Sequence, residues 1–221
     1  MRPRRSISRR CVVVAFLIAL AFSPALANPP QMNLSTLKQA CVTYHDSGEY
    51  LVDVAAIDHE AEAWIEKTSA TERAALVLDI DETAITNWDY YKKLSFGFDY
   101  PSFHTFCLET RAQALEPTRL LYEHARNRNV TVFFVTGRRE TMHAITIDDL
   151  HEAGYPAWND LMMAPAGYHE RSISTFKTAC RKRITEMGYH IIANVGDQES
   201  DLAGGYADKA FKLPNPFYLV P

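Results

Sequence analysis

Three acidic residues stand within four positions directly after an apolar run in the stretch LVLDIDETAI: Asp79, Asp81 and Glu82. Carboxylates this close together raise one another's pKa values unless a cation shares them. Residues two apart on an extended chain project to the same side, so Asp79 and Asp81 can enter one pocket. The spacing therefore predicts a catalytic pair that holds a cation. The alternative is a strand-end turn with solvated acids, and the motifs that follow disfavour it.

Two later apolar runs also end in polar residues. VTVFFVTGR ends in Thr136, Gly137 and Arg138, and HIIANVGD leads into the acids Asp197 and Asp201 of GDQESD. In an open parallel sheet, ligands bind in the crevice outside the carboxyl ends of the strands, so these groups should meet there. The sequence leaves open whether Arg138 contacts a substrate or pairs with an acid.

A hard divalent cation suits this set, because all the candidate ligands are oxygens. Asp79, Asp81 and Asp197 predict a Mg2+ site that keeps several waters. Spacings typical of softer metals, such as CxxC and HExxH, do not occur. The Thr136 hydroxyl and the Gly137 amide could bind phosphate oxygens. These parts predict phosphoryl transfer, which needs a nucleophile, charge neutralisation and a proton donor.

Lys177 lies on a predicted helix between the second and third motifs and could add positive charge to the phosphate site. A lysine on a solvated helix surface is the competing interpretation. The neighbouring Arg181 and Lys182 are rivals for the same role, and Arg181, Lys182 and Arg183 together suggest one solvated helix face. Glu82 is predicted to be structural, near the start of the next element.

The elements that must position these residues indicate an α/β protein with a three-layer, Rossmann-like parallel sheet. Three continuous apolar runs predict strands buried on both faces, and five helices are expected between or before them, the first between residues 33 and 46. The strands are expected at residues 74–80, 130–138 and 190–197, and the other helices near 51–65, from Pro117, at about 140–153 and at 175–187. The proline-rich tail LPNPFYLVP is expected to lie extended over the body.

Residues 86–115 form an aromatic-rich stretch without clear periodicity, predicted to be a small cap-like insert after the first motif. Aromatic residues in such a stretch usually pack in a core. The sharper hypothesis is that Trp88 or Tyr91 covers the site and stacks on an aromatic or nucleoside leaving group.

The N-terminus has the organisation of a secretory signal peptide. MRPRRSISRR carries five arginines, CVVVAFLIALAF is too short to span a bilayer, and Ala25-Leu26-Ala27 offers a cleavage site. We predict a signal peptide at 1–27, cleavage after Ala27, a mature domain at 28–221, and a periplasmic or secreted location without a stable membrane anchor. Ser8-Arg9-Arg10 also permits twin-arginine export.

The predicted mature chain is acidic, which bears on its partners. The whole chain has a formal charge of −4, and loss of the five N-terminal arginines leaves 18 basic against 27 acidic residues, or −9. Such a surface argues against binding a nucleic acid polymer or anionic lipid. The sequence does not decide whether the chain forms a homo-oligomer. Cys41, Cys107 and Cys180 remain after cleavage, and an exported protein could form one disulfide among them.

These motifs resemble those of a known family. DIDET, VTGR, a lone lysine and GDQESD, in this order, are similar to the four motifs of the haloacid dehalogenase (HAD) superfamily. FFVTGRRETMHAITIDDLHEAGYPAW and FKLPNPFY resemble its acid phosphatase subfamily IIIB, which includes plant vegetative storage proteins and class C-like bacterial phosphatases. The resemblance covers roughly residues 35–221. No lipobox is present, so the lipid anchor of the bacterial lipoprotein branch is not carried over.

The resemblance implies a role for each motif residue. Asp79 would be the nucleophile that forms an aspartyl-phosphate, and Asp81 the general acid and later base, with its backbone carbonyl on Mg2+. Thr136 and Lys177 would hold the phosphate. The last two roles fall to residues that come after the third strand: Asp197 would bind the metal, and Asp201 would lie behind the metal ligands and orient Lys177 or a metal-bound water.

We therefore expect an exported, Mg2+-dependent acid phosphatase with an acidic pH optimum. Its substrate would be a small phosphomonoester, such as a nucleoside monophosphate. Two alternatives remain: a phosphotransferase to alcohol acceptors, and a non-catalytic storage or binding relative. The intact Asp79 and Asp81 argue against the second alternative.

Overall fold

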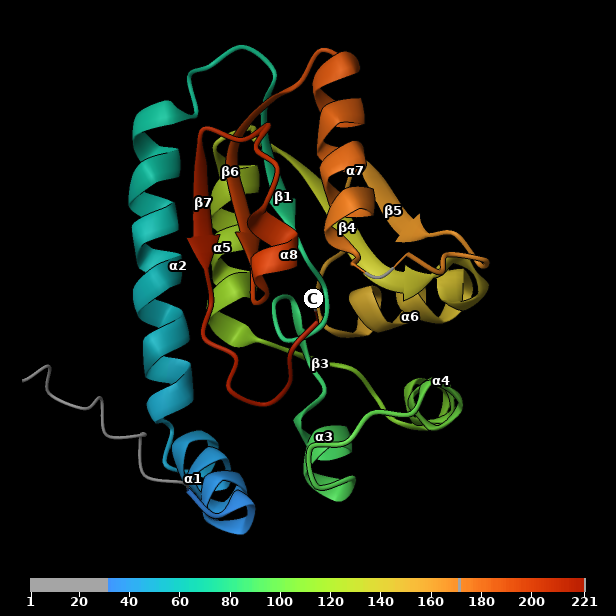
Figure 1. Cartoon of the computed structure of the whole chain (residues 1–221). Coiled ribbons are helices and arrows are strands. Elements are labelled where there is room, and N and C mark those ends of the chain that lie inside the picture. Colours follow the sequence, from blue (N-terminus) through green and yellow to red (C-terminus); the bar gives the residue numbers. More distant parts are fainter. Residues whose placement is uncertain (1–31, 171, 221) are drawn as a thin grey trace, which may run out of the picture. The chain divides into compact units, whose positions relative to one another are not determined.

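The apolar run before the first acidic motif forms the central strand of the sheet. The computed structural model describes residues 32–170 and 172–220. Strand β1 (Ala74–Leu78) is buried along its whole length and pairs in parallel with β4 (Thr131–Arg139) and β6 (His190–Gly196). Two shorter strands, β5 (Asp160–Ala164) and β7 (Lys209–Lys212), complete the parallel order β5-β4-β1-β6-β7 (Figure 1). The three predicted strands are confirmed, and two edge strands were missed.

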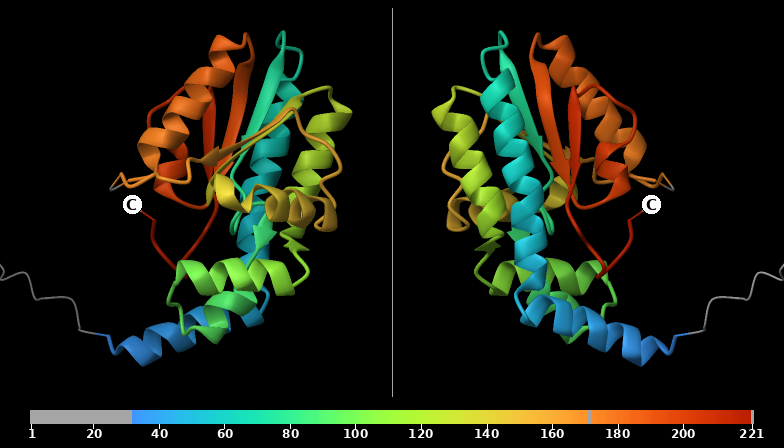
Figure 2. Two further views of the ribbon diagram at one scale, coloured as in Figure 1. Left: turned by 90° about the vertical axis from the view of Figure 1, so that its right-hand side faces the viewer. Right: turned by 90° about the vertical axis from the view of Figure 1, so that its left-hand side faces the viewer.

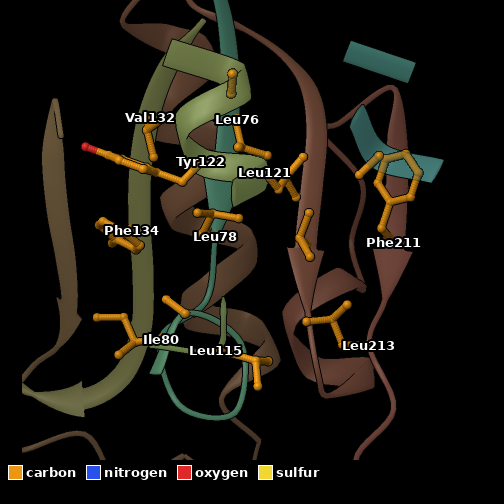
Figure 3. Close-up of a cluster of buried hydrophobic side chains, with 14 of the residues drawn as sticks. Leu76, Leu78, Ile80, Leu115, Leu121, Tyr122, Val132, Phe134, Phe211 and Leu213 are labelled. Atoms are coloured by element: carbon orange, nitrogen blue, oxygen red, sulfur yellow. The ribbon is translucent and has the colours of Figure 1, made fainter. Parts of the chain in front are cut away.

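Helices cover both faces of this sheet, because β1 is apolar on both sides. Leu76 and Leu78 face a cluster that includes residues of α2 (Glu49–Thr68) and α5 (Glu116–Asn127) (Figure 3). Ala75 and Val77 face the opposite cluster, to which α7 (Ser174–Glu186) contributes. The model therefore has the predicted three layers, with α2 and α5 on one face and α7 on the other (Figure 2).

The remaining helices lie mainly beyond the carboxyl ends of the strands. Helix α1 (Leu34–Asp46) begins at Asn33, whose side chain accepts a hydrogen bond from the Ser35 amide at 2.9 Å. The helix expected at 140–153 is a 3-10 turn, η1 (Glu140–Met142), followed by α6 (His143–Glu152). The short α8 (Glu199–Leu202) follows β6. Gly154 and Gly188 end their helices with positive φ angles of 87° and 86°, as expected of glycine there.

The aromatic stretch forms a compact insert at the carboxyl edge of the sheet (Figure 1). Strands β2 (Ile85–Thr86) and β3 (Gln113–Ala114) pair antiparallel at its base, and between them lie α3 (Trp88–Lys93) and α4 (Tyr100–Glu109). A third apolar cluster, which includes Tyr90, Phe103 and Met163, attaches the insert to η1 and β5.

Other expectations have different outcomes. In the described part of the chain, Cys41, Cys107 and Cys180 are all free thiols. No helix in that part combines the length and apolar character needed to cross a bilayer. The predicted signal peptide lies outside the described residues.

A buried acid links two helices of one layer. Asp58 of α2 is 1% exposed, and its Oδ2 accepts a hydrogen bond from the Thr118 hydroxyl of α5 at 2.9 Å. Its Oδ1 has no partner within the described residues. Burial raises the pKa of Asp58 to about 7, the Thr118 hydrogen bond opposes this rise, and the Glu62 charge adds to it.

We predict that Asp58 makes folding stability fall between about pH 4 and pH 7. The folded state keeps its proton up to about pH 7, whereas the unfolded chain releases it near its ordinary value of 3.8. The contribution of Asp58 to folding stability is thus intact below pH 4 and is lost as the pH rises through 7, by on the order of 4 kcal/mol. Urea unfolding at pH 4.5 and 7.5 should show Asp58→Asn gaining relative stability at the higher pH. Glu60→Gln, at an exposed position of α2, should not. An Asp58→Asn effect equal at both pH values would contradict the prediction.

Candidate active site

The carboxyl ends of β1, β4 and β6 open onto a cavity of about 370 Å³. The fold brings nearly all predicted site residues together there. The lining residues from the predicted motifs are Asp79, Asp81, Gly137, Arg138, Lys177, Asp197 and Asp201. Thr136 is fully buried beside them, and its hydroxyl accepts a hydrogen bond from the Arg138 amide at 3.0 Å. Parallel pairing explains the convergence, because it places all three strand ends on one edge.

Lys177 links two of the acids through a buried ion pair on each side. From α7, its Nζ lies 2.5 Å from Asp79 Oδ1 and 2.5 Å from Asp201 Oδ1, and all three side chains are at most 7% exposed. Burial lowers the pKa of Lys177, but the carboxylates of Asp201 and Asp79 raise it more, so the lysine is charged. The structure therefore selects Lys177 over Arg181 and Lys182, since Arg181 donates to the carbonyls of Gly205 and Asp201, and Lys182 pairs with Glu186 on the surface.

Three buried carboxylates could hold a cation beside this lysine. Oxygens of Asp79, Asp197 and Asp201 all lie within 4.8 Å of one another. If ionised, these acids exceed the charge of Lys177 by two, a balance that a divalent cation would restore. Burial, and then the Asp201 carboxylate, raise the pKa values of Asp79 and Asp197, as expected when such acids lack a shared cation. Hard oxygen donors and excess negative charge fit a divalent cation of the magnesium or calcium type.

Asp201 lies closer to this group than the sequence suggested. The sequence placed Asp79, Asp81 and Asp197 on the metal and Asp201 behind them. In the structure, an oxygen of Asp201 gathers with those of Asp79 and Asp197, whereas the Asp81 carboxylate points toward Arg138. The Asp81 backbone carbonyl accepts a hydrogen bond from the Tyr218 hydroxyl at 3.4 Å. The carbonyl and the carboxylate of Asp81 thus have different partners.

Neutral donors hold Asp197 in place. Its carboxylate accepts hydrogen bonds from Gln198 Nε2 and Asn215 Nδ2, each at 2.6 Å, and from Thr83 Oγ1 at 3.2 Å. These donors orient the acid without adding a positive charge that would compete with a cation. Sequence reasoning missed all three. Thr83 and Gln198 lie within the recognised motifs DIDET and GDQESD, and Asn215 stands between two prolines of the tail, which were the only available signals.

Gly196 allows Asp201 to fold back into the cavity. An added Cβ at Gly196 would lie 2.4 Å from the Cβ of Asp201 and 2.5 Å from its Oδ2. Asp201 Oδ2 in turn accepts a hydrogen bond from the Gln198 amide at 2.8 Å, which closes the first turn of α8. Glycine at the end of β6 therefore permits the approach of Asp201 to Lys177.

Arg138 pairs with acids, which is one of the two roles that the sequence left open. Its guanidinium contacts Asp81 on one side and Asp149 of α6 on the other. Glu82 is structural, as predicted: it is buried, its backbone φ is 54°, and its carboxylate accepts hydrogen bonds from the Asn87 amide at 2.5 Å and the Tyr218 hydroxyl at 3.3 Å.

Aromatic side chains from three segments form one wall of the cavity. Tyr91 stacks on Tyr218 of the tail, with ring centroids 4.6 Å apart, and both line the cavity. The other aromatic lining residues are Phe98, Tyr100, Phe103 and Tyr168. Trp88 does not reach it. Its ring stacks 3.8 Å from the ring of His45 and packs on Phe217. Trp88 is therefore a core residue, as aromatic residues of such a stretch usually are.

Comparison with known proteins identifies similar chains. Residues 20–221 match the model of a family described as HAD superfamily, subfamily IIIB (Acid phosphatase). Acid phosphatase 1 of Solanum lycopersicum is 32% identical over 79% of this chain and 66% of its own length. The stem 28 kDa glycoprotein of Glycine max is 29% identical over 84% of this chain and 77% of its own length. The match thus spans just under two thirds of the tomato relative.

A solved structure has the same fold. The class C acid phosphatase from Bacillus anthracis superimposes with a TM-score of 0.69, covering 84% of this chain and 86% of that chain at 18% identity. At this identity, the likeness establishes the architecture of the sheet and its helices. The roles of individual residues need separate arguments.

We predict that Gly196→Ala disrupts the carboxylate cluster. The added methyl group would overlap Asp201, and overpacking of this kind costs about 1–3 kcal/mol. Thermal denaturation should show lower stability, and titration with a divalent cation should show weaker binding. Gly167→Ala is the matched control, because nothing lies within 4 Å of its added Cβ. Unchanged cation affinity in Gly196→Ala would show that the close approach is not required.

Proposed function

This chain belongs to subfamily IIIB of the HAD superfamily, the acid phosphatases, and we propose that it hydrolyses small phosphomonoesters through an aspartyl-phosphate on Asp79. The convergence of Asp79 with Lys177, Asp197 and Asp201 on one cavity is the observation that supports this proposal most strongly. A buried carboxylate can act as a nucleophile when neighbouring cations neutralise the incoming phosphate.

In the first step, an oxygen of Asp79 attacks the phosphorus atom and the bond to the leaving oxygen breaks. Asp81 donates a proton to that oxygen, so the leaving group departs as an alcohol. Lys177 stabilises negative charge on the phosphoryl oxygens. The Gly137 amide and the Thr136 hydroxyl lie near the end of β4, the neighbour of β1, and would complete the phosphate contacts. The product is a phosphoryl group bound to Asp79.

In the second step, Asp81 takes a proton from water, whose oxygen attacks the phosphorus atom. The bond between phosphorus and the Asp79 oxygen breaks, which releases inorganic phosphate and restores both carboxyl groups. Asp81 can serve both steps because its carboxylate lines the cavity close to Asp79. Phosphoryl transfer to an alcohol would follow the same route, and no observation favours it over water.

We propose Mg2+ as the cation. Asp79, Asp197 and the Asp81 backbone carbonyl would hold it, and Asp201 would orient Lys177 or a bound water. When bound, the ion would neutralise phosphate oxygens and the excess charge of the buried acids. Magnesium suits this role because it commonly combines a few carboxylates with waters and substrate phosphates.

The insert and the N-terminus complete the proposal. Residues 86–115 would act as a small cap. The pairing of β2 with β3 closes this insert at its base, and aromatic residues of the insert line the cavity. Tyr91 would contact the organic part of a substrate such as a nucleoside monophosphate. Residues 1–27 would direct export to the periplasm or beyond and then be removed. The chain is also similar to vegetative storage proteins, but Asp79 and Asp81 are both present, so we favour a catalytic role over storage.

Asp79→Asn should abolish hydrolysis of p-nitrophenyl phosphate, because a carboxamide cannot form the acyl phosphate. We expect kcat to fall by at least about 1,000-fold. Circular dichroism should confirm folding, and Asp89→Asn, at an exposed position of α3, is the control. An Asp79→Asn protein with full activity would refute the nucleophile assignment.

Removal of divalent cations with EDTA should lower the rate by at least about tenfold, because the buried acids would lose their neutralising partner. Dialysis followed by added Mg2+ should restore the activity. Asn215→Ala should need a higher Mg2+ concentration for half-maximal activity, because Asp197 would lose one orienting donor. Full activity of the dialysed protein in excess EDTA would rule out cation dependence.

A further inference from the structure

We propose that Arg138 and Asp149 are positioning residues that hold Asp81 with one carboxylate oxygen directed toward the leaving group. This inference rests on the proposed function, in which Asp81 donates a proton to that group. Asp149 lies on α6, within the longer run that resembles subfamily IIIB but outside the four short motifs of the superfamily. The structure links it to Asp81 through a single guanidinium group.

The guanidinium of Arg138 lies between two carboxylates and is almost fully buried. Its side chain is 1% exposed, against 6% for Asp149 and 19% for Asp81. Nη1 donates to Asp149 Oδ2 at 2.5 Å, while Nε and Nη2 face Asp81. Because the guanidinium is planar, a partner on Nη1 fixes the direction of the N–H groups on the other edge.

The two oxygens of Asp81 have different environments as a result. Oδ1 accepts hydrogen bonds from Arg138 Nη2 at 2.8 Å, Arg138 Nε at 3.0 Å and Asn87 Nδ2 at 2.9 Å. Among the residues that the structure describes, only Arg138 Nε donates to Oδ2, at 3.1 Å. None of these donor groups can accept a proton, so Oδ1 is committed as an acceptor. Oδ2 is then the oxygen available to a substrate in the cavity.

The backbone aims Arg138 into this position. The pairing of β4 with β5 shifts register between Thr136 and Arg139, so the chain departs from regular alternation there. The Thr136 hydroxyl accepts the Arg138 amide, and the guanidinium lies 5.5 Å from the centre of the Phe103 ring. With the arginine enclosed in this way, Asp149 supplies the charged partner on its far side.

This arrangement predicts a dependence on the leaving group. Protonation matters greatly when an alkoxide departs and little when p-nitrophenolate departs, because the latter is already stable as an anion. Loss of positioning should therefore slow alkyl phosphates more than p-nitrophenyl phosphate. A purely structural role for Asp149 would slow both substrates by the same factor.

The test compares kcat/KM for glycerol 2-phosphate and p-nitrophenyl phosphate in Asp149→Asn. We expect about a tenfold to hundredfold loss with glycerol 2-phosphate and less than about threefold with p-nitrophenyl phosphate. Asp148→Asn is the matched control, since Asp148 is the exposed neighbour on the same helix, and it should behave as wild type. Equal losses for both substrates, or no loss, would overturn the proposal.

Two more variants separate this inference from the proposed function. Asp81→Asn should show the same leaving-group selectivity, and adding Asp149→Asn to it should cause little further loss. If Asp81→Asn lacks selectivity, the proposed function fails. If Asp81→Asn is selective and Asp149→Asn is not, only the positioning role fails. Should Asp149→Asn not fold, Arg138→Lys keeps the charge but loses the planar fork, and it must show the same selectivity.

Discussion

The ammonium group of Lys177 between Asp79 and Asp201 is the interaction on which the rest of the site depends. Lys177 lies on α7, a helix on one face of the sheet, and its Nζ lies 2.5 Å from a carboxylate oxygen of each acid, one after β1 and one after β6. Without this cation, three acids within 4.8 Å of one another would be buried with no positive partner among them. Three carboxylates can be buried together only when a positive group neutralises part of their charge. The same ion pairs therefore hold α7 at the strand ends and keep the acids of the site in place.

Two kinds of support surround this interaction, and they differ in charge. Asp197 is held by neutral amides and a hydroxyl, which leave its negative charge available. Asp81 is held by a guanidinium that a further acid partly balances. The first arrangement suits an acid that binds a cation, and the second suits an acid that must present one oxygen. The site thus gives different surroundings to Asp81 and Asp197, two carboxylates that follow the neighbouring strands β1 and β6.

Sequence reasoning located the strands and residues whose signals are local. Continuous apolar runs revealed β1, β4 and β6, and acids placed at their ends revealed the site. Strands β5 and β7 were missed because they have only five and four residues and mixed polarity. The contacts of Asp149 and Asn215 were missed for another reason. They join residues 11 and 18 positions apart that lie in different elements, and no spacing in a single sequence indicates which side chains of separate elements will meet.

The tail that follows β7 has a consequence for biosynthesis. Asn215 contacts Asp197, and the Tyr218 hydroxyl reaches the carbonyl of Asp81 across 137 positions of sequence. A ribosome makes Asp81 long before it makes Asn215 and Tyr218. A nascent chain therefore lacks part of its carboxylate support until residues 215–218 have been made, which delays the assembly of a competent catalyst past that point.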